Sequence, residues 1–407
     1  MRKPFRVLFV ATYPPRACGI GTFTRDLTAT LRREVRWMDI DIAAIDYCDE
    51  EHLDYPGEVV CRIKNHQPQA YAELACMANA SDYDAICVQH EFGIFPGEWG
   101  QEVLNLYQAC EKPIVTTLHT VIPNCPEIPR QVTRRIVRNS YATVVMARVG
   151  VDLLRNNYGV QFGNLKVIPH GVPAIPRVGE FRAKELLGLQ DRDVISSFGL
   201  ISRGKGVEYM IAAMPEIVRS RPNALYCVLG RTHPIVVRRE GESYRDELIR
   251  MVETLRMQDH VRFVNKFLDD TELSLYLEAT DVYVTPYLGA GQITSGTMAR
   301  AIFCGKAIVS TPYLYACELL ANGRGRLVAF QDSSAMAQEL VAVLSDTALR
   351  AGMEASTRAY GRNMSWEATA RQYARVFDKV ALATRRLAPL ARPAIQRVFR
   401  HQLLEIR

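Results

Sequence analysis

The chain contains one stretch that limits its fold more than any other, DVYVTPYLGAGQITSGTMARAIFCGKAIVSTP at residues 281–312. An apolar run around Val282 is followed by a loop with two glycines, a small-residue helix start at Thr294 and a second apolar run at Ala307. Strand, glycine loop, helix and strand in this order make the βαβ unit of a parallel sheet. The loop then lies at the carboxyl edge of the sheet, where such sheets bind ligands.

The predicted helix start carries four small residues, Thr294, Ser295, Gly296 and Thr297. A hydroxyl at this point caps the helix, and the first N–H groups then point outward at the positive end of the helix dipole. Such a helix start suits a phosphate group. An ordinary helix cap with a tight turn explains the same residues without a ligand, so both interpretations stay open at this point.

Length and composition indicate more than one globular domain. A chain of 407 residues exceeds one ordinary hydrophobic core, and 48% hydrophobic with 23% charged residues is typical of globular proteins. No apolar run reaches the roughly 18–20 residues that a spanning helix needs, and the apolar stretch Val7–Ala11 is too short for a signal peptide. The ten cysteines show no C-x-x-C spacing, so we expect a cytoplasmic protein without a metal centre or a disulfide framework.

The first half of the chain alternates strand and helix patterns, which predicts a parallel sheet covered on both faces. Polar residues and glycines follow three of its strands, namely Gly19 and Gly21, His90 and Glu91, and His119. The carboxyl ends of parallel strands share one edge, so we expect these residues on one rim, where the glycines let a ligand or a facing domain approach the backbone. Turn glycines and packing histidines are the alternative. The G-x-G-x-x-G fingerprint is missing, so no dinucleotide cofactor is expected.

A proline-rich segment at residues 167–177 marks the exit from the first domain, because proline stiffens such crossings. We therefore predict an N-terminal domain over residues 1–172, a C-terminal domain over 173–365, and C-terminal helices with a basic tail over 366–407.

The second domain begins with its own strand and glycine loop, and this loop contains Arg203 and Lys205. Cations before a helix N-terminus oppose the helix dipole, so we expect them to bind an anion. An ordinary charged surface is the alternative. The decisive expectation is geometric: Lys205 and Ser295 should meet in space and bind the same anion.

The segment after Thr384 carries six arginines and one acidic residue, which makes it strongly basic. An apolar stripe from Leu387 to Leu403 could lie opposite these arginines, as in helices that bind anionic membrane surfaces. Pro389 and Pro393 interrupt the first turns of such a helix, and a solvated helix face is the alternative. We expect peripheral contact with the inner membrane surface through this tail, and no nucleic-acid partner.

Several motifs together resemble the GT-B glycosyltransferases of family four, a large and mostly retaining family. The motifs are Gly199-x5-Lys205-Gly206, VIPHG at 167–171, His119 at a strand end, DVYVTP at 281–286, GKAIVS at 305–310 and ELL at 318–320. The similarity extends to about Ala383. It implies an α/β fold with two doubly wound Rossmann-like domains facing a cleft, and a C-terminal helix that returns across the first domain.

The resemblance implies a hexosyltransferase that uses a nucleoside-diphosphate sugar as substrate, needs no cofactor, and acts on a carbohydrate or glycolipid acceptor. The string THPIVVRREGESYR at 232–245 resembles a bacterial subgroup associated with mannoside metabolism, so GDP-mannose is the first expected donor and UDP-glucose the second. Transfer away from a diphosphate needs charge stabilisation on the leaving group more than a protein nucleophile. Residues Asn265–Phe267, which include Lys266, are then expected to flank the nucleotide base.

The resemblance also assigns roles to single residues. It implies that Lys205 binds the donor diphosphate together with the helix at Ser295. His119 would contact the donor sugar near the reacting carbon, and Gly19 would lie beside the phosphates.

Three positions depart from the family pattern. Two family glutamates align with Gln292 and Arg300, and a family arginine is replaced by Leu200. We expect Gln292 to bind sugar hydroxyls without charge, Arg300 to meet a phosphate or the partner sugar, and Arg203 to replace the missing cation. A GT-B disaccharide phosphorylase, favoured by the added arginines, and a non-catalytic sugar-nucleotide-binding subunit, favoured by the lost glutamates, are the alternatives.

Overall fold

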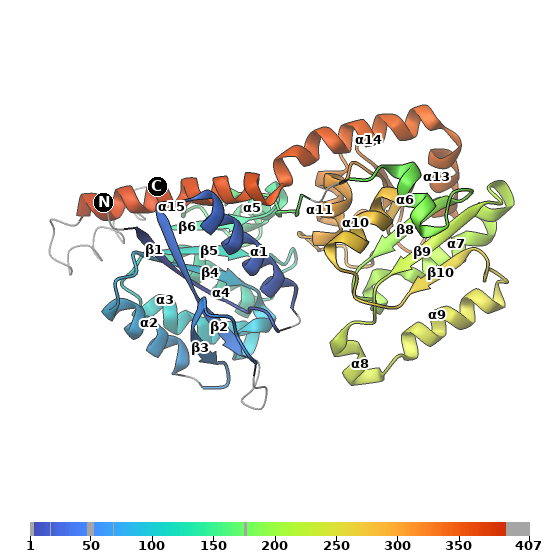
Figure 1. The fold of residues 1–407 in the computed structure, drawn as a ribbon. Coiled ribbons are helices and arrows are strands. Elements are labelled where there is room, and N and C mark those ends of the chain that lie inside the picture. Colours follow the sequence, from blue (N-terminus) through green and yellow to red (C-terminus); the bar gives the residue numbers. More distant parts are fainter. Residues whose placement is uncertain (1–3, 17, 47–52, 68, 175–176, 388–407) are drawn as a thin grey trace. The chain divides into compact units, whose positions relative to one another are not determined.

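The structure, a computed structural model, describes residues 4–16, 18–46, 53–67, 69–174 and 177–387. The chain forms two compact units, each with its own parallel sheet and helices (Figure 1). The first unit combines the chain up to Gly171 with the chain from Trp366 onward, and the second is Val172–Ser365. The predicted α/β class with two Rossmann-like sheets is confirmed. The predicted basic tail beyond Leu387 lies outside the described residues, and the predicted cleft stays a prediction.

The first sheet has seven parallel strands in the order β3-β2-β1-β4-β5-β6-β7. Its strands are β1 (Phe5–Ala11), β2 (Met38–Asp46), β3 (Val59–Lys64), β4 (Ala85–His90), β5 (Ile114–Leu118), β6 (Ala142–Val145) and β7 (Leu165–Val167). Its helices are α1 (Gly19–Glu34), α2 (Ala70–Ala80), η1 (Phe92–Ile94), η2 (Glu98–Val103), α3 (Leu104–Ala109), α4 (Glu127–Asn139), α5 (Arg148–Asn156) and α15 (Trp366–Leu387). The strand order reverses between β1 and β4.

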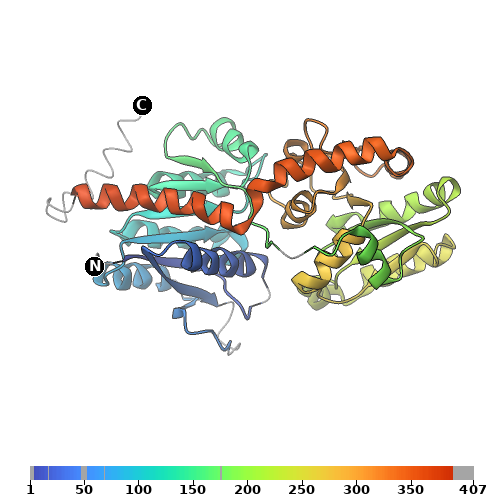
Figure 2. The ribbon, with the colours of Figure 1, turned by 45° about the horizontal axis from the view of Figure 1, so that its top comes forward.

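Helix α15 completes the core of the first unit, although it follows the second unit in the sequence. It lies beside α1 on one face of the sheet (Figures 1 and 2). Its residues Trp366, Tyr373 and Phe377 are buried in the same apolar cluster as β1 and α1. The ring centroid of Phe377 lies 6.2 Å from that of Phe9. The first sheet therefore needs a distant part of the chain to cover its apolar surface.

The second sheet has six parallel strands in the order β10-β9-β8-β11-β12-β13, and this order reverses between β8 and β11. Its strands are β8 (Asp193–Phe198), β9 (Ala224–Leu229), β10 (Val261–Val264), β11 (Val282–Thr285), β12 (Ala307–Ser310) and β13 (Arg326–Leu327). Its helices are α6 (Glu180–Leu187), η3 (Arg203–Lys205), α7 (Val207–Ser220), α8 (Pro234–Glu240), α9 (Ser243–Thr254), α10 (Asp270–Ala279), α11 (Gly296–Phe303), α12 (Leu314–Leu319), α13 (Ser333–Ser345), α14 (Thr347–Gly361) and η4 (Arg362–Met364).

Strand β9 shows why the strands of this sheet are continuous apolar runs. Tyr226 and Val228 join the cluster that contains α7, α9 and α13, whereas Leu225, Cys227 and Leu229 join the cluster that contains α6. Successive side chains point to opposite faces, and both faces are covered by helices. The two strand-end loops at the reversal in strand order are therefore held by a fully packed sheet.

Candidate functional site

Each sheet brings the predicted site residues to the place where its strand order reverses. In open α/β sheets, ligands bind outside the carboxyl ends of the strands at such a reversal. In the second sheet, the loop after β8 carries Lys205 and the loop after β11 ends at Ser295. In the first sheet, β1 leads to Gly19 and β4 ends at His90.

The two loops of the second unit touch each other. Gly206 has a φ of +63°, and a Cβ atom there would lie 2.0 Å from the carbonyl oxygen of Pro286. The Leu288 N–H donates to the carbonyl oxygen of Gly204 at 3.0 Å. Only glycine combines this backbone conformation with so close an approach. The glycine of the Lys205-Gly206 pair therefore lets the β8 loop seat against the β11 loop.

Lys205 and the start of α11 are connected through Tyr287. The Lys205 ammonium lies 3.9 Å from the centroid of the Tyr287 ring. The Tyr287 hydroxyl lies 2.7 Å from Thr297 Oγ1, which lies 3.0 Å from Ser295 Oγ. Lys205 and Ser295 are thus linked through Tyr287 and Thr297 at one end of the sheet, and the anion that they were expected to share stays a prediction.

The start of α11 has the geometry expected of an anion site. The Met298 N–H donates to Ser295 Oγ at 3.2 Å, so Ser295 caps the helix as predicted. The N–H groups of Gly296 and Thr297 lie in the first turn and have no acceptor within the helix, and the helix dipole adds positive potential there. Thr294 Oγ1 is buried without a hydrogen-bond partner among the described residues. Buried hydroxyls nearly always have a partner, so this atom is consistent with a ligand contact.

Gln292 borders the same helix start. Its Nε2 donates to the backbone oxygen of Thr294 at 2.7 Å, and the Tyr315 N–H donates to the backbone oxygen of Gln292 at 3.0 Å. These bonds hold the amide beside the predicted anion site, where its side-chain oxygen can accept a hydrogen bond from a sugar hydroxyl.

Arg203 was predicted to bind the anion, and in the structure its guanidinium is paired with carboxylates. Its guanidinium makes two bonds of 2.8 Å to the Glu247 carboxylate, lies 3.5 Å from Glu240, and covers the Tyr244 ring at 4.9 Å. The hydrogen bonds from Arg203 lower the pKa of Glu247. Both acids belong to the segment around α8 and α9, so the charge of Arg203 is balanced inside the protein.

The motif at residues 232–245 contacts the loop after β8 and the helix α7 that follows it. The Tyr244 hydroxyl donates to Glu208 in the first turn of α7, and the Thr232 hydroxyl donates to Glu242. Arg245 donates to the backbone oxygen of Gly230 at 2.8 Å. Backbone bonds from Ile201 N–H to the Arg231 oxygen and from His233 N–H to the Ile201 oxygen, each 2.9 Å, tie the loops after β8 and β9 together. We call these contacts, together with the pairs of Arg203 with Glu240 and Glu247, the α8–α9 brace.

Arg300 and Lys266 each pair with a carboxylate in the structure. Arg300 lies in the last turn of that helix, and its guanidinium is 2.6 Å from the Asp270 carboxylate. Lys266 follows the edge strand β10 and pairs with Glu272. The expected phosphate contact of Arg300 and the expected place of Lys266 beside the nucleotide base stay predictions.

His119 lies at the end of β5, on the predicted rim of the first unit. Its Nε2 donates to the side-chain oxygen of Gln89 at 3.0 Å, and its ring meets Phe23 edge-on at 4.9 Å. Burial lowers the pKa of His119 to about 3, with further lowering by His170 and His90. The imidazole is therefore neutral at pH 7, and with the proton on Nε2 its Nδ1 can accept a hydrogen bond from a hydroxyl.

His90 and Glu91 were expected on the same rim as ligand groups, and the structure gives both a structural setting. His90 is fully buried, stacks on Phe95 at 5.4 Å and meets Phe92 edge-on at 5.1 Å. Glu91 caps η1 by accepting from the Phe92 N–H at 3.1 Å, and its other oxygen accepts from the Thr120 hydroxyl. His90 and Glu91 therefore support the structure of the rim through packing and helix capping.

Gly19 and Gly21 belong to the first turn of α1, not to the loop before it as predicted. Gly21 packs against the backbone of Tyr13, with its Cβ position 3.4 Å from Tyr13 Cα. Among the described residues, no atom apart from the chain neighbours and the α1 backbone lies within 4 Å of the Cβ position of Gly19. Neither glycine has a positive φ, which removes the turn explanation for both.

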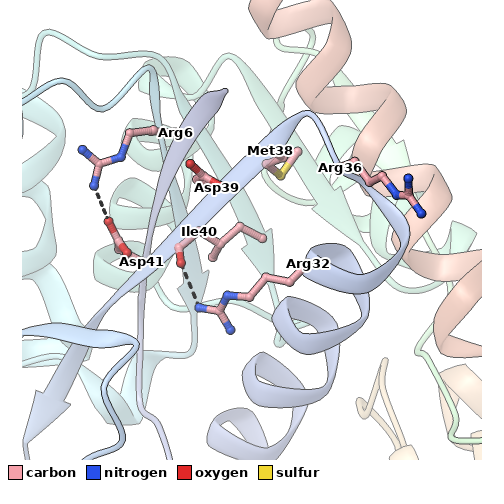
Figure 3. Close-up of a pocket in the computed structure, with 7 residues that line it drawn as sticks. All are labelled: Arg6, Arg32, Arg36, Met38, Asp39, Ile40 and Asp41. Carbon is pink, nitrogen blue, oxygen red and sulfur yellow. Dashed lines mark hydrogen bonds and ion pairs between the residues drawn. The ribbon is translucent and has the colours of Figure 1, made fainter. Parts of the chain in front are cut away.

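A pocket of 720 Å³ lies at the opposite edge of the first sheet (Figure 3). It is lined by Arg6, Arg32, Arg36, Met38, Asp39, Ile40 and Asp41. Within it, Arg6 lies 2.7 Å from Asp41, and Arg32 donates to the backbone oxygen of Ile40 at 2.8 Å. These arginines already have partners at the amino ends of β1 and β2, so the pocket is not the candidate site.

Sequence reasoning missed Tyr287 and the acids of the brace. Tyr287 follows a strand in an ordinary-looking Thr-Pro-Tyr string, and Glu240 and Glu247 lie about forty residues from the arginine they balance. No spacing rule connects such positions. In the described part of the chain, no group of three or more His, Cys, Asp or Glu residues is placed to hold a metal ion.

Comparison with known proteins places these features in context. The family model "Glycosyl transferases group 1" matches residues 192–346. A phosphatidyl-myo-inositol mannosyltransferase of Mycolicibacterium smegmatis is 30% identical over 280 residues, which cover 67% of each chain. A D-inositol 3-phosphate glycosyltransferase of Xylanimonas cellulosilytica is 28% identical over 301 residues, again 67% of each chain.

Solved structures share the fold at low sequence identity. Anabaena Alr3699/HepE in complex with UDP has a TM-score of 0.69 at 16% identity, covering 92% of this chain and 100% of that one. A sucrose-phosphate synthase from Thermosynechococcus elongatus has a TM-score of 0.74 at 18% identity, covering 93% of this chain and 99% of that one. Both likenesses extend over nearly the whole chain and therefore include both units.

Proposed function

Because the chain belongs to the group 1 glycosyl transferases, and is therefore a glycosyltransferase with the GT-B fold, we propose that it transfers a hexosyl group from a nucleoside-diphosphate sugar to a carbohydrate or glycolipid acceptor. One observation carries the donor side of this proposal. The Lys205 ammonium and the Ser295-capped start of α11 meet through Tyr287 at the reversal in the second sheet.

In the proposed reaction the donor diphosphate is the leaving group. Negative charge grows on its bridging oxygen as the bond to the sugar breaks, and preorganised positive groups stabilise that charge. Lys205 provides a full charge, and the N–H groups of Gly296 and Thr297 provide the helix start. No protein nucleophile is required for this stabilisation. Arg203 has a supporting role in this scheme, because Glu240 and Glu247 balance its charge.

His119 and Gln292 are proposed to bind the donor sugar through neutral hydrogen bonds. Burial lowers the pKa of His119 to about 3, so the ring is neutral at pH 7 and can bind sugar hydroxyls only through neutral hydrogen bonds. The amide of Gln292 offers one acceptor and two donors. Both groups would orient the sugar and leave charge stabilisation to Lys205.

GDP-mannose is the proposed donor, with UDP-glucose second. The support comes from relatives: one is named phosphatidyl-myo-inositol mannosyltransferase, and another, 24% identical, is named a GDP-mannose-dependent mannosyltransferase. A structural neighbour at 16% identity is described with UDP-glucose. The acceptors in the mannosyltransferase names are inositol lipids, which favours a glycolipid acceptor at a membrane surface. No helix among the described residues is long and apolar enough to cross a membrane.

The two alternatives lose their support. The phosphorylase alternative depended on free cations at Arg203 and Arg300, and both are paired with carboxylates. The non-catalytic alternative depended on the missing glutamate pair, but the family assignment makes the chain an enzyme.

The test is release of nucleoside diphosphate from a panel of GDP- and UDP-hexoses, with inositol-lipid and free-sugar acceptors. We expect GDP-mannose to give the highest rate. Phosphate-dependent cleavage of disaccharides, or no release with any donor, would contradict the proposal. Lys379→Ala, which removes an exposed lysine from α15 in the other unit, is the control for variants of Lys205.

A further inference from the structure

The segment that follows β4 forms a rigid platform at the rim of the first unit. Phe92, Ile94 and Phe95 are each only 5–6% exposed, and η1 is capped by Glu91. The buried ring of His90 packs against Phe92 and Phe95 from below. Such burial fixes the backbone of the segment, so its exposed residues are presented in a defined place.

Trp99 in this segment has a strained backbone. Its φ of 54° and ψ of 32° are left-handed, a conformation that bulky residues rarely adopt. The next residue, Gly100, also has a positive φ, and a Cβ atom there would lie 2.8 Å from the Phe92 carbonyl oxygen. A strained residue of this kind persists only where the surrounding structure enforces its conformation, and such residues cluster at functional sites. Glycine or asparagine would fit the same turn with less strain.

Core packing does not explain the tryptophan. The Trp99 side chain is 39% exposed, and its ring meets Phe92 edge-on, with centroids 5.7 Å apart at 88°. Phe92 thereby supports one edge of the indole. Trp37 is a useful comparison, because it is 40% exposed, has no positive φ, and precedes β2 at the opposite edge of the sheet. The two tryptophans are therefore equally exposed, but only Trp99 has a strained backbone and lies at the ligand-binding edge of the sheet.

A flat aromatic face suits the C–H face of a saturated, hydroxylated ring, whose remaining hydroxyls need polar partners. One such partner is His119 on the neighbouring strand: its N–H bonds the carbonyl oxygen of His90, whose ring contacts Phe92, and Phe92 in turn contacts Trp99. We propose that Trp99 forms an acceptor subsite, on which the pyranose or cyclitol ring of the acceptor stacks. This inference rests on the proposed glycosyl transfer and adds the place where the acceptor ring binds.

The experiment replaces Trp99 with residues that suit a left-handed backbone. Trp99→Gly removes the ring and relieves the strain, so its melting temperature should not fall below that of the unmodified enzyme. Trp99→Asn is the second variant in case the glycine loosens the loop, and Trp37→Phe is the matched control. Tryptophan fluorescence is titrated with myo-inositol and methyl α-mannopyranoside, and acceptor and donor KM are measured in parallel.

We expect a saturable fluorescence change in the unmodified enzyme and in Trp37→Phe, and its loss in both Trp99 variants. The acceptor KM should rise tenfold or more in those variants, while the donor KM and donor hydrolysis stay unchanged. An unchanged acceptor KM in a folded Trp99 variant, or no fluorescence response in the unmodified enzyme, would overturn the subsite. The fluorescence titration contains no donor, so it tests the subsite independently of donor binding. A failure of the unmodified enzyme to bind any donor would instead count against the proposed function.

Discussion

Lys205 is the residue on which the proposed chemistry depends most directly. Its ammonium rests on the Tyr287 ring at 3.9 Å, next to the start of α11. Lys205→Ala should lower turnover by roughly 10²-fold or more, the order of loss when one preorganised charge contact is removed. The rate of nucleoside-diphosphate release at saturating donor measures this. A turnover close to that of Lys379→Ala would show that Lys205 does not stabilise the leaving group.

The buried His90 ring should make the folded protein less stable in acid. Burial lowers its pKa to about 3 from an ordinary value of 6.5, and neither ring nitrogen has a partner in the described structure. Below pH 6.5 the His90 ring binds a proton in the unfolded chain but not in the folded protein. The free energy of unfolding therefore falls as the pH falls from 6.5 towards 3. At pH 5 the loss from this residue is about 2 kcal/mol.

His90→Leu should remove this dependence, because it places an apolar side chain between Phe92 and Phe95. The measurement is the free energy of unfolding by urea at pH 7 and at pH 5. The difference between the two pH values should shrink by about 2 kcal/mol relative to the unmodified protein. An unchanged difference would mean that His90 gains a proton without unfolding.

At the scale of elements, the α8–α9 brace makes Arg203 a positioning residue. Arg203→Glu should raise the donor KM, because it places a carboxylate opposite those of Glu240 and Glu247. The double variant Arg203→Glu with Glu247→Arg restores the ion pair with its charges exchanged, so donor KM should recover most of the loss. If Arg203 bound the diphosphate directly, the exchange would leave an anion in the donor loop and no recovery would occur. Donor KM measured at low and at high salt distinguishes the positioning role of Arg203 from direct binding of the diphosphate.

The sequence predicted the central strands, but it did not predict the edge strands β3 and β13. The strands β8, β9 and β11 are recognisable because burial on both faces requires continuous apolar runs. Edge strands need no such runs: β3 alternates exposed residues with residues of which only Ile63 is fully buried, and both residues of β13 are exposed. The helix start at Gly19 was taken for a loop, since no residue there caps the helix with its side chain.

The candidate site was predictable to the extent that topology determines it. Lys205 and Ser295 follow strands β8 and β11, which are neighbours in the sheet, so their meeting follows from the strand order. The partners of Arg203 and Arg300 depend on how surface helices pack, and these side-chain pairings leave no periodic signal. The buried position of His90 was equally hidden, because a strand-end histidine can point into the core or into solvent.

For the whole molecule, helix α15 decides whether the first unit can fold. A chain ending at Ser365 lacks Trp366, Tyr373 and Phe377, which are each at most 5% exposed in the first core. We expect this truncation to lose the cooperative unfolding of the first unit and to expose apolar surface, measured by calorimetry and by dye binding. A chain ending at Leu387 keeps α15 and should unfold normally. Normal unfolding of the shorter chain would show that α15 is dispensable.

The longer truncation also tests the predicted tail. A chain ending at Leu387 lacks four of the six arginines counted after Thr384. If the tail binds membranes, sedimentation with anionic liposomes should decrease relative to the full chain, while donor turnover on a water-soluble acceptor stays the same. Equal sedimentation of both chains would assign any membrane contact to another part of the molecule.

The discontinuous first unit also affects how the protein is made. During synthesis, β1 and α1 leave the ribosome long before α15, because all of Val172–Ser365 is translated in between. At usual elongation rates this delay is roughly ten to forty seconds. Throughout that interval the nascent chain exposes apolar surface that its own sequence cannot yet cover, which makes it a client for chaperones. Chains stalled just after Ser365 should therefore be cleaved by protease within residues 5–171 faster than chains stalled after α15 has emerged.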